Sequence, residues 1–282
     1  MIYDCFLYYD EDMLLEIRLN TLYESVDRFV IVESTHTFTG KPKKLNFDIS
    51  RFEKFRDKIE YVIFEDLPLL KNNAGNEVDA WANEAATRNA IMRGLKDARD
   101  DDIILISDVD EIFTPEAIRQ INPSHLCTIF HMGFYNYQFN LQVFNTDGCT
   151  RLCTLPRATT LSNMKKHFDS EPETFRNIKK SKVFKSFISK TLFKYRSKTI
   201  KDAGWHFSWI MTPERIAEKM SSISHTEYDL PHLNNKEHII HALTNGKDIW
   251  NRDRKMVKQP LVAPQFPHYL VENAEKFSSF IL

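Results

Sequence analysis

Two aspartates separated by one residue are the part of the sequence best suited to chemistry. Asp108 and Asp110 follow an apolar, β-branched run at 103–106, which is typical of a strand buried on both faces. Because side chains alternate along a strand, both aspartates are expected to point the same way and Val109 the opposite way. Two carboxylates about 5 Å apart repel each other by a few kcal/mol at an effective dielectric constant of about 20. A bound cation would remove that repulsion.

The position of these acids allows two interpretations. Ligands of open α/β sheets bind just beyond the carboxyl ends of the strands, which favours a D-x-D site for a metal ion and a sugar nucleotide. The alternative is an acidic loop before a helix, since Thr114, Pro115 and Glu116 have the pattern of an N-cap and a first helical turn.

The segments before residue 124 predict the framework that would position this motif. Short apolar runs alternate with segments in which apolar residues recur at helical spacing. This alternation predicts an α/β fold with a mostly parallel central sheet flanked by helices. The expected strands lie at 2–8, 29–32, 58–64 and 103–107, and the expected helices cover 15–26 and 79–98.

Beyond residue 124 the sequence is rich in aromatic residues and less regular. Strand candidates lie at 125–132, 135–144, 151–160 and 203–209, and Thr212 is expected to cap a helix. No linker divides the chain. We therefore expect a single domain over 1–282, with a nucleotide-binding half at 1–123 and, at 124–282, an acceptor half with C-terminal helices.

Composition and charge exclude several classes of protein. The hydrophobic content of 42% is ample for a core, and a net charge of −1 with a pI of about 6.8 gives no sign of nucleic-acid binding. We expect neither a membrane span nor a signal peptide. The four cysteines lack the spacing of a zinc site, so we expect free thiols and a cytoplasmic protein.

Three sequence blocks together resemble glycosyltransferase family 17, which includes enzymes that add a bisecting N-acetylglucosamine to N-glycans. Their order and spacing fit across roughly residues 2–250. The blocks are 14–19 with 26–34, 108–112 with 130–132, and the Gly-Trp-His block at 203–209 followed by Thr212, Pro213 and Glu214.

The resemblance implies a GT-A type fold and an inverting, metal-dependent glycosyltransferase. The reaction implied is transfer of a sugar, expected to be N-acetylglucosamine, from a UDP-sugar to a hydroxyl group of a glycan acceptor. A divalent metal ion is implied as cofactor, with Mn²⁺ preferred to Mg²⁺ for a mixed oxygen and nitrogen ligand set.

Within the family pattern, Asp110 is expected to bind the metal, and Asp108 to be shared between metal-bound water and the ribose. His206 is a third candidate ligand, since GT-A enzymes commonly bring a late-chain histidine or aspartate to the metal. If Trp205 and Trp209 are buried, His206 must point to the other face of its strand, within about 8 Å of the Asp110 carboxylate. The alternative is a histidine in the core.

Two further residues are expected to contact the nucleotide sugar. Glu33 closes a strand near the expected nucleoside, although it could equally be an acid in a surface turn. Arg88 lies on the apolar stripe of its helix, and a buried guanidinium needs an anion. That anion could be the donor diphosphate or an internal carboxylate, from Asp108 or Glu111.

The acceptor side offers weaker candidates. Trp205 could stack on a sugar and Tyr137 could offer its hydroxyl, with core packing as the alternative for both. An inverting transferase also needs a general base near the acceptor hydroxyl. Asp202 and Glu227 are the candidates in the half expected to face the acceptor.

Two other functions compete with a transferase. A phosphatase of the haloacid dehalogenase type also uses a strand-end D-x-D. Its motif has Thr or Val two residues after the second aspartate, where this chain has Ile112. The second is a catalytically silent sugar-binding protein of the same fold, against which the presence of Asp108, Asp110 and His206 argues.

Overall fold

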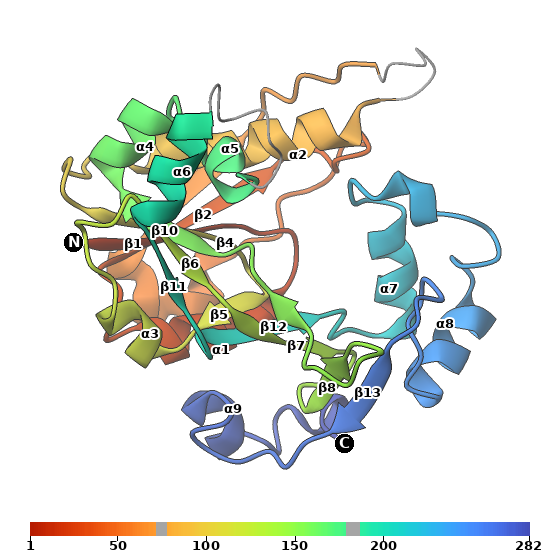
Figure 1. Ribbon diagram of the computed structural model, residues 1–282. Helices are drawn as coiled ribbons and strands as arrows, with labels where there is room; N and C mark the ends of the chain where they lie inside the picture. The colour runs from red at the N-terminus through yellow and green to blue at the C-terminus, as the bar shows by residue number, and fades with distance from the viewer. Residues whose placement is uncertain (72–77, 179–186) are drawn as a thin grey trace.

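Two β-sheets form the framework of the protein (Figure 1). The computed structural model describes residues 1–71, 78–178 and 187–282. The first sheet has the order β11-β6-β10-β4-β1-β2-β3; β1 to β4 pair in parallel, and β10 is antiparallel to both neighbours. The predicted α/β class with a mostly parallel sheet is confirmed. The strands are β1 (Ile2–Leu7), β2 (Arg28–Ser34), β3 (Ile59–Phe64), β4 (Ile103–Asp108), β6 (Cys127–Phe130), β10 (Arg157–Thr160) and β11 (Ser197–Ile200).

The second sheet has the order β13-β8-β7-β12-β5, with β9 beside β7. It takes β5 from the front of the chain, whereas β6, β10 and β11 from the back of the chain complete the first sheet. The boundary expected at 123/124 therefore does not separate the two sheets. The strands are β5 (Glu111–Phe113), β7 (Met132–Asn136), β8 (Leu141–Phe144), β9 (Leu152–Cys153), β12 (Gly204–Ser208) and β13 (Lys255–Lys258).

Helices cover both faces of the first sheet (Figure 1). Helices α1 (Asp12–Leu22) and α3 (Pro115–Arg119) pack on one face, and α4, α5, α6 and the turn η2 pack on the other. In the described residues every helix falls short of the length and apolar character needed to cross a bilayer. The other helices are α2 (Ala80–Asn89), α4 (Leu161–His167), α5 (Pro172–Arg176), α6 (Phe187–Tyr195), α7 (Pro213–Met220), α8 (Lys236–Thr244) and α9 (His268–Glu272), and the 3₁₀ segments are η1 (Ile49–Lys58), η2 (Ala90–Gly94), η3 (Thr226–Tyr228) and η4 (Ser278–Phe280).

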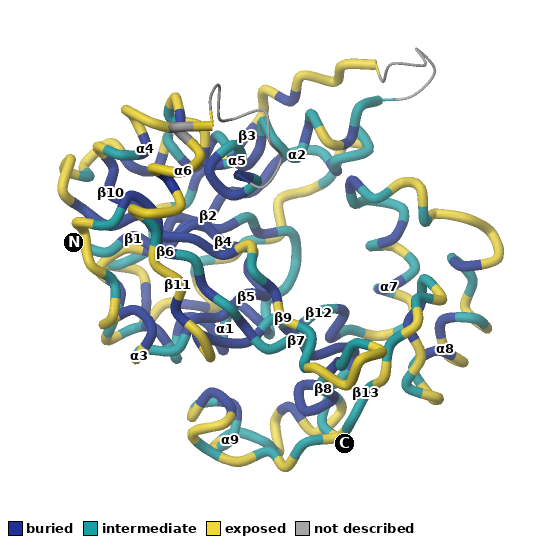
Figure 2. The backbone as a smooth tube through the Cα atoms, viewed as in Figure 1, coloured by how far each residue is buried: buried dark blue, intermediate teal, exposed yellow. Residues whose placement is uncertain are grey.

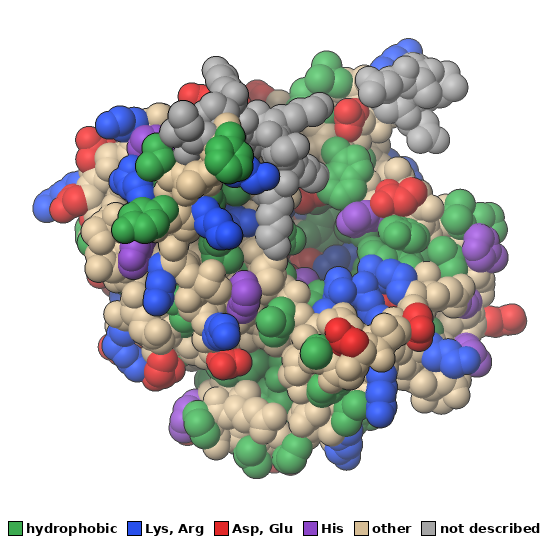
Figure 3. Space-filling view, in the orientation of Figure 1, with side chains coloured by type: hydrophobic (Ala, Val, Ile, Leu, Met, Phe, Trp, Pro, Cys, Tyr) green, Lys and Arg blue, Asp and Glu red, His purple; other side chains and the backbone are tan. Residues whose placement is uncertain are grey.

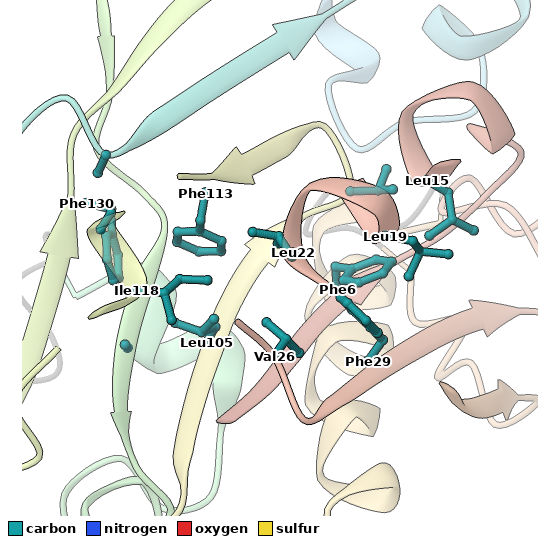
Figure 4. Packing of buried hydrophobic residues seen from close by; sticks show 14 of the residues in the cluster. Phe6, Leu15, Leu19, Leu22, Val26, Phe29, Leu105, Phe113, Ile118 and Phe130 are labelled. Carbon is teal, nitrogen blue, oxygen red and sulfur yellow. The ribbon is translucent and has the colours of Figure 1, made fainter. Parts of the chain in front are cut away.

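Buried side chains alternate between the two faces of the first sheet. Phe6, Phe29 and Leu105 belong to the cluster that contains Leu15 and Leu19 of α1 (Figure 4). Their neighbours along each strand pack on the other face, against η2 and α4. Strands β1, β2 and β4 are therefore buried along most of their length (Figure 2), as expected for the run at 103–106.

The helix expected over 79–98 is shorter than predicted. Asp79 caps α2, which gives way to η2, and η2 ends at Gly94. There the chain lies so close to β2 that a Cβ atom on Gly94 would be 2.5 Å from Val30 Cγ1. The buried residues of α2 are Ala80, Asn83, Thr87 and Arg88, whereas Trp81 is 45% exposed.

A buried arginine holds the loop that follows β4. The Arg18 guanidinium, on α1, is fully buried and pairs with Asp4 of β1 through Nε–Oδ2 and Nη2–Oδ1 contacts of 2.7 and 2.5 Å. Its Nη1 donates to the main-chain oxygens of Asp108 and Glu111, at 2.8 and 2.9 Å. Because these carbonyl groups bind one planar group, α1 and β1 together set the direction of the loop.

Replacing Arg18 should therefore destabilise the whole fold. We expect Arg18→Met to lower the free energy of unfolding by about 3–5 kcal/mol, because Asp4 would stay buried without its partner. The double variant Asp4→Leu/Arg18→Met should lose less than the sum of the two single variants. Urea denaturation followed by tryptophan fluorescence measures all three, and a loss below about 1 kcal/mol in Arg18→Met would contradict this account.

Candidate functional site

A cleft of about 520 Å³ opens beside the carboxyl ends of β1, β2 and β4. Tyr9 follows β1, while Ser34 and Asp108 are the last residues of β2 and β4. His206 on β12 and Lys219 on α7 complete other parts of the lining. Figure 3 shows the hollow, with basic side chains gathered along part of its rim. The D-x-D loop and the Gly-Trp-His block thus meet in one cleft.

Asp108 is neutralised by the protein itself. Its Oδ1 lies 2.6 Å from Arg88 Nη1, and its Oδ2 lies 2.6 Å from Arg176 Nη2. Two arginines therefore neutralise Asp108 without a metal ion. Asp108 also lines the cleft and its side chain is 37% exposed, so contacts of its remaining lone pairs with metal-bound water and the ribose stay a prediction.

Arg88 has its anions within the protein. It is buried and pairs with Asp108, with Glu84 at 2.5 Å and with Glu173 at 2.7 Å. Two partners were predicted for Arg88, a donor diphosphate or an internal carboxylate. In the structure its partners are internal carboxylates, among them the predicted Asp108.

Arg176 was missed by the sequence analysis. It binds Glu111 through Nη1–Oε2 and Nη2–Oε1 contacts of 2.7 and 2.8 Å, in addition to Asp108. Its helix α5 has only five residues in a lysine-rich stretch without clear periodicity. Pro172 at the start of that helix was the one local signal.

Asp110 and His206 face each other in the cleft and are available to bind a ligand. The Asp110 Oδ2 and His206 Nε2 atoms are 3.6 Å apart, although almost 100 residues separate them in the chain. On β12 the neighbours Trp205 and Phe207 are buried in a core cluster, so His206 points to the opposite face, as its strand parity predicted. The expected separation below about 8 Å is met.

The two side chains adjust each other's pKa. Burial lowers the pKa of His206, but Asp110 and Cys153 outweigh that effect and raise it well above its usual value of 6.5. Burial raises the pKa of Asp110, but His206, followed by Lys219, brings it below its usual value. Without a metal ion, the pair is therefore an ion pair at neutral pH.

The pair fits a divalent metal ion. Within the described residues, Asp110 Oδ1 is buried and has no hydrogen-bond partner, which is costly unless another group binds it. The 3.6 Å separation exceeds a normal hydrogen bond. Two atoms that each bind one ion at about 2.1 Å can lie up to about 4.2 Å apart. A carboxylate oxygen and an imidazole nitrogen are both common ligands of divalent metal ions.

Glu111 and Cys153 adjoin this pair but support the loop. Ligand atoms of Glu111, Cys153 and His206 lie within 4.8 Å of one another. Glu111 also accepts hydrogen bonds from the Asp108 amide at 2.8 Å and from Cys153 Sγ at 3.1 Å. Because Arg176 neutralises it as well, Glu111 has a full set of partners, and its role is to fix the loop.

Glu33 is engaged away from the cleft. Its buried carboxylate pairs with Lys43 and accepts hydrogen bonds from the Asn46 and Phe47 amides at 2.7 and 3.0 Å. The Tyr61 hydroxyl donates to it at 2.8 Å. The predicted nucleotide contact is therefore corrected to an anchor for the loop after β2.

Both predicted acceptor residues lie in the core. Trp205 is 6% exposed, and its indole N–H donates to the main-chain oxygen of Gln265 at 2.8 Å. Tyr137 is 1% exposed and binds the main chain of Lys247 and Ile249 through its hydroxyl. Neither lines the cleft, so core packing, the alternative interpretation, holds for both.

The general-base candidates are also outside the cleft. Asp202 is exposed in the turn between β11 and β12, and Glu227 is exposed in η3, where it binds His225 Nδ1 at 2.7 Å. Neither residue lines the cleft itself, although Glu227 is bound to His225, which does, and the role of general base stays a prediction.

An aromatic group in the cleft was not foreseen as part of the site. The Trp81 and His225 rings have centroids 4.7 Å apart, and His225 lies 5.5 Å from Trp250. Rings of this kind can contact sugar C–H groups. Because they come from three distant segments, no local pattern indicated them.

Comparisons with known proteins agree with this arrangement of motifs. The sequence pattern of glycosyltransferase family 17 matches residues 1–153. The β-1,4-mannosyl-glycoprotein 4-β-N-acetylglucosaminyltransferase of Rattus norvegicus is 27% identical over 226 residues, which are 76% of this chain and 41% of the relative. The Homo sapiens protein of that name is also 27% identical, over 76% of this chain and 42% of its own length. The chain thus spans about two fifths of these relatives.

Likeness to solved structures is weak. The inositol-1-phosphate CTP transferase of T. maritima is 14% identical and covers 79% of this chain and 96% of its own, with a TM-score of 0.34. At that score the likeness supports no statement about function. The family pattern, in contrast, covers more than half of the chain and includes the D-x-D loop, and we conclude that this chain belongs to glycosyltransferase family 17.

Proposed function

We propose that the protein is an inverting, metal-dependent glycosyltransferase that moves N-acetylglucosamine from UDP-N-acetylglucosamine to a hydroxyl group of a glycan. The observation that carries this proposal is the Asp110–His206 pair, in which one carboxylate oxygen is buried and has no hydrogen-bond partner among the described residues, in the cleft of a family 17 chain. The names of the relatives support N-acetylglucosamine as the sugar.

The cleft has the size and position expected for a nucleotide sugar. Its volume of about 520 Å³ is within the usual range for small-molecule sites. It lies at the carboxyl ends of parallel strands, where α/β sheets bind nucleotides. Tyr9 and His36 follow β1 and β2 at this edge, and they are suitably placed to contact the nucleoside.

The chemistry requires stabilisation of a leaving nucleoside diphosphate. A divalent ion bound by Asp110 and His206 would supply positive charge to that leaving group. Arg18, Arg88 and Arg176 hold the loop that carries Asp110, so the ligand atoms are in place before substrate binds. Lys219 adds a positive charge beside Asp110.

A phosphatase is less compatible with this site. The first aspartate of its D-x-D must be free to attack phosphorus. Here Asp108 has arginine donors on both oxygens, which lowers its nucleophilicity. Assays with UDP-N-acetylglucosamine and with a phosphate monoester separate the alternatives, because a transferase releases UDP from the first, a phosphatase releases inorganic phosphate from the second and a silent binding protein releases neither.

The metal assignment predicts the behaviour of Asp110→Ala. We expect transfer, measured as UDP release at saturating donor and low Mn²⁺, to fall by about 100-fold or more, because several kcal/mol of transition-state stabilisation are lost. The fold should persist, since Asp110 carries no ion pair of the loop scaffold. Asp101→Ala, at the exposed opposite end of β4, is the matched control and should behave as wild type. Activity of Asp110→Ala within tenfold of wild type would refute the assignment.

Donor binding should appear as thermal stabilisation. A ligand at about 100 times its Kd stabilises the folded state by roughly 2.7 kcal/mol, which corresponds to about 5 °C or more in Tm for a chain of this size. We expect that shift for UDP-N-acetylglucosamine with Mn²⁺ and its loss with EDTA. A larger shift with another nucleotide sugar would change the donor, whereas a shift that EDTA leaves intact would contradict metal-dependent binding.

Metal binding should depend on pH through His206. Its raised pKa means that the metal-free imidazole is protonated at neutral pH, and only the neutral form can bind a metal ion. We expect Mn²⁺ affinity to rise by about tenfold per pH unit from pH 6 upward, until the pH passes the raised pKa. Titration calorimetry in two buffers should show release of about one proton. An affinity that is constant above about pH 6.5, or a slope retained in His206→Gln, would be the contrary result.

A further inference from the structure

Three arginines lie together in the part of the cleft formed by the second sheet. Arg151 directly precedes β9, and Arg252 and Arg254 lie just before β13. The two segments are adjacent because β8 pairs with β13, and the Arg151 amide donates to Val143 of β8 at 2.9 Å. All three arginines line the cleft, and basic side chains are visible at its rim in Figure 3.

These arginines have too few anions within the protein. Arg252 binds Asp248 with an Nη2–Oδ2 distance of 2.8 Å, and Arg254 Nη1 lies 3.3 Å from the same oxygen. For Arg151, no carboxylate of the described residues lies within ion-pair distance. Three guanidinium groups therefore share one buried carboxylate, which leaves an excess of two positive charges.

Two buried nitrogen atoms of the cluster also make no hydrogen bond. Among the described residues, Arg151 Nε has no hydrogen-bond partner, and Arg254 Nη1 has only its ion-pair contact with Asp248. Burial, with the charges of Arg252 and Arg151, lowers the pKa of Arg254 to about 10. A cluster of like charges with unused donors is costly to the fold unless an anion binds to it.

The cluster lies next to the proposed metal pair. The Arg151 guanidinium carbon is 5.1 Å from the centre of the Phe134 ring, and the Phe134 and His206 rings are 4.3 Å apart. One phenyl ring thus separates Arg151 from the metal pair. The arginines belong to the second sheet, whereas the strand ends proposed to hold the nucleoside belong to the first.

We propose that Arg151, Arg252 and Arg254 form an anion subsite for a phosphate or carboxylate group carried by the acceptor. The assignment to the acceptor rests on the proposed transferase function; the binding of an anion does not. A planar guanidinium with free N–H donors matches either group through paired hydrogen bonds.

Inorganic phosphate is the probe that tests the subsite independently of the reaction. We expect calorimetry to show phosphate binding to the metal-free wild type, and binding at least about tenfold weaker in Arg151→Gln. Arg119→Gln removes an exposed arginine of α3 and should match wild type. Arg254→Gln gives a second variant, and melting curves show that each variant is folded. No phosphate binding, or equal binding in Arg151→Gln, would overturn the subsite.

Titration with UDP-N-acetylglucosamine and Mn²⁺ distinguishes the donor from the acceptor as the source of the anion. We expect the affinity of Arg151→Gln for this donor to stay within about twofold of wild type. A loss of affinity for the donor of tenfold or more would overturn the acceptor assignment and indicate that the arginines bind the donor diphosphate. If the donor binds to neither protein, the proposed transferase function fails, whereas the phosphate titration still decides the subsite.

Paired acceptors, with and without a phosphate or carboxylate group, complete the test. For the anionic member, Arg151→Gln should raise KM about tenfold with a smaller change in kcat, and Arg151→Lys should recover part of the loss. Neutral members should show no such difference. Equal KM changes for both members of a pair would overturn the proposal.

Discussion

The buried contact between Arg18 and Asp4 is the interaction on which the rest of the site depends. A helix, the first strand and the loop after β4 all meet at one guanidinium group, which binds the Asp4 carboxylate and main-chain oxygens of the loop. Desolvation offsets much of the Coulomb energy of such a pair, so its main contribution is to fix the relative positions of the helix, the strand and the loop. It fixes where the chain goes after Asp108, and therefore where Asp110 lies.

Two further arginines give the acidic residues of the loop after β4 different roles. Arg88 and Arg176 arrive from helices on the other face of the first sheet and neutralise Asp108 and Glu111. Among the described residues, Asp110 pairs with no arginine and faces His206 at 3.6 Å. Two of the three acids thus hold the loop rigid, and the third keeps a free oxygen. A rigid loop is what electrostatic catalysis needs, because ligands already in place require no reorganisation.

Much of the fold and part of the site could be predicted from the sequence. Periodicity located β1 to β4 and α1, because local pattern and burial agree in a parallel sheet covered on both faces. Strand parity predicted the direction of His206, since alternation is a local property. The partners of Asp108 could not be predicted, because Arg176 lies on a five-residue helix far along the chain. Glu33, Trp205 and Tyr137 were wrongly placed in the site because their partners were not evident from the sequence: the loop after β2 binds Glu33, and main-chain groups of distant segments bind Trp205 and Tyr137. Residue type indicates what a side chain can do, but partners brought by distant segments decide whether it is free to do it.

The pairing of β5 with β12 has a consequence for how this site can vary among related chains. In that ladder His206 pairs with Glu111, the residue that directly follows Asp110. The Phe207 amide donates to the Asp110 carbonyl at 2.8 Å. Backbone hydrogen bonds between these neighbouring strands therefore set the distance between the Asp110 and His206 side chains. Within the long segment that connects them, β7 supports β12 and Arg176 of α5 holds Glu111, so these parts maintain the spacing. Insertions or deletions elsewhere in that segment could change the shape of the cleft while Asp110 and His206 keep their distance.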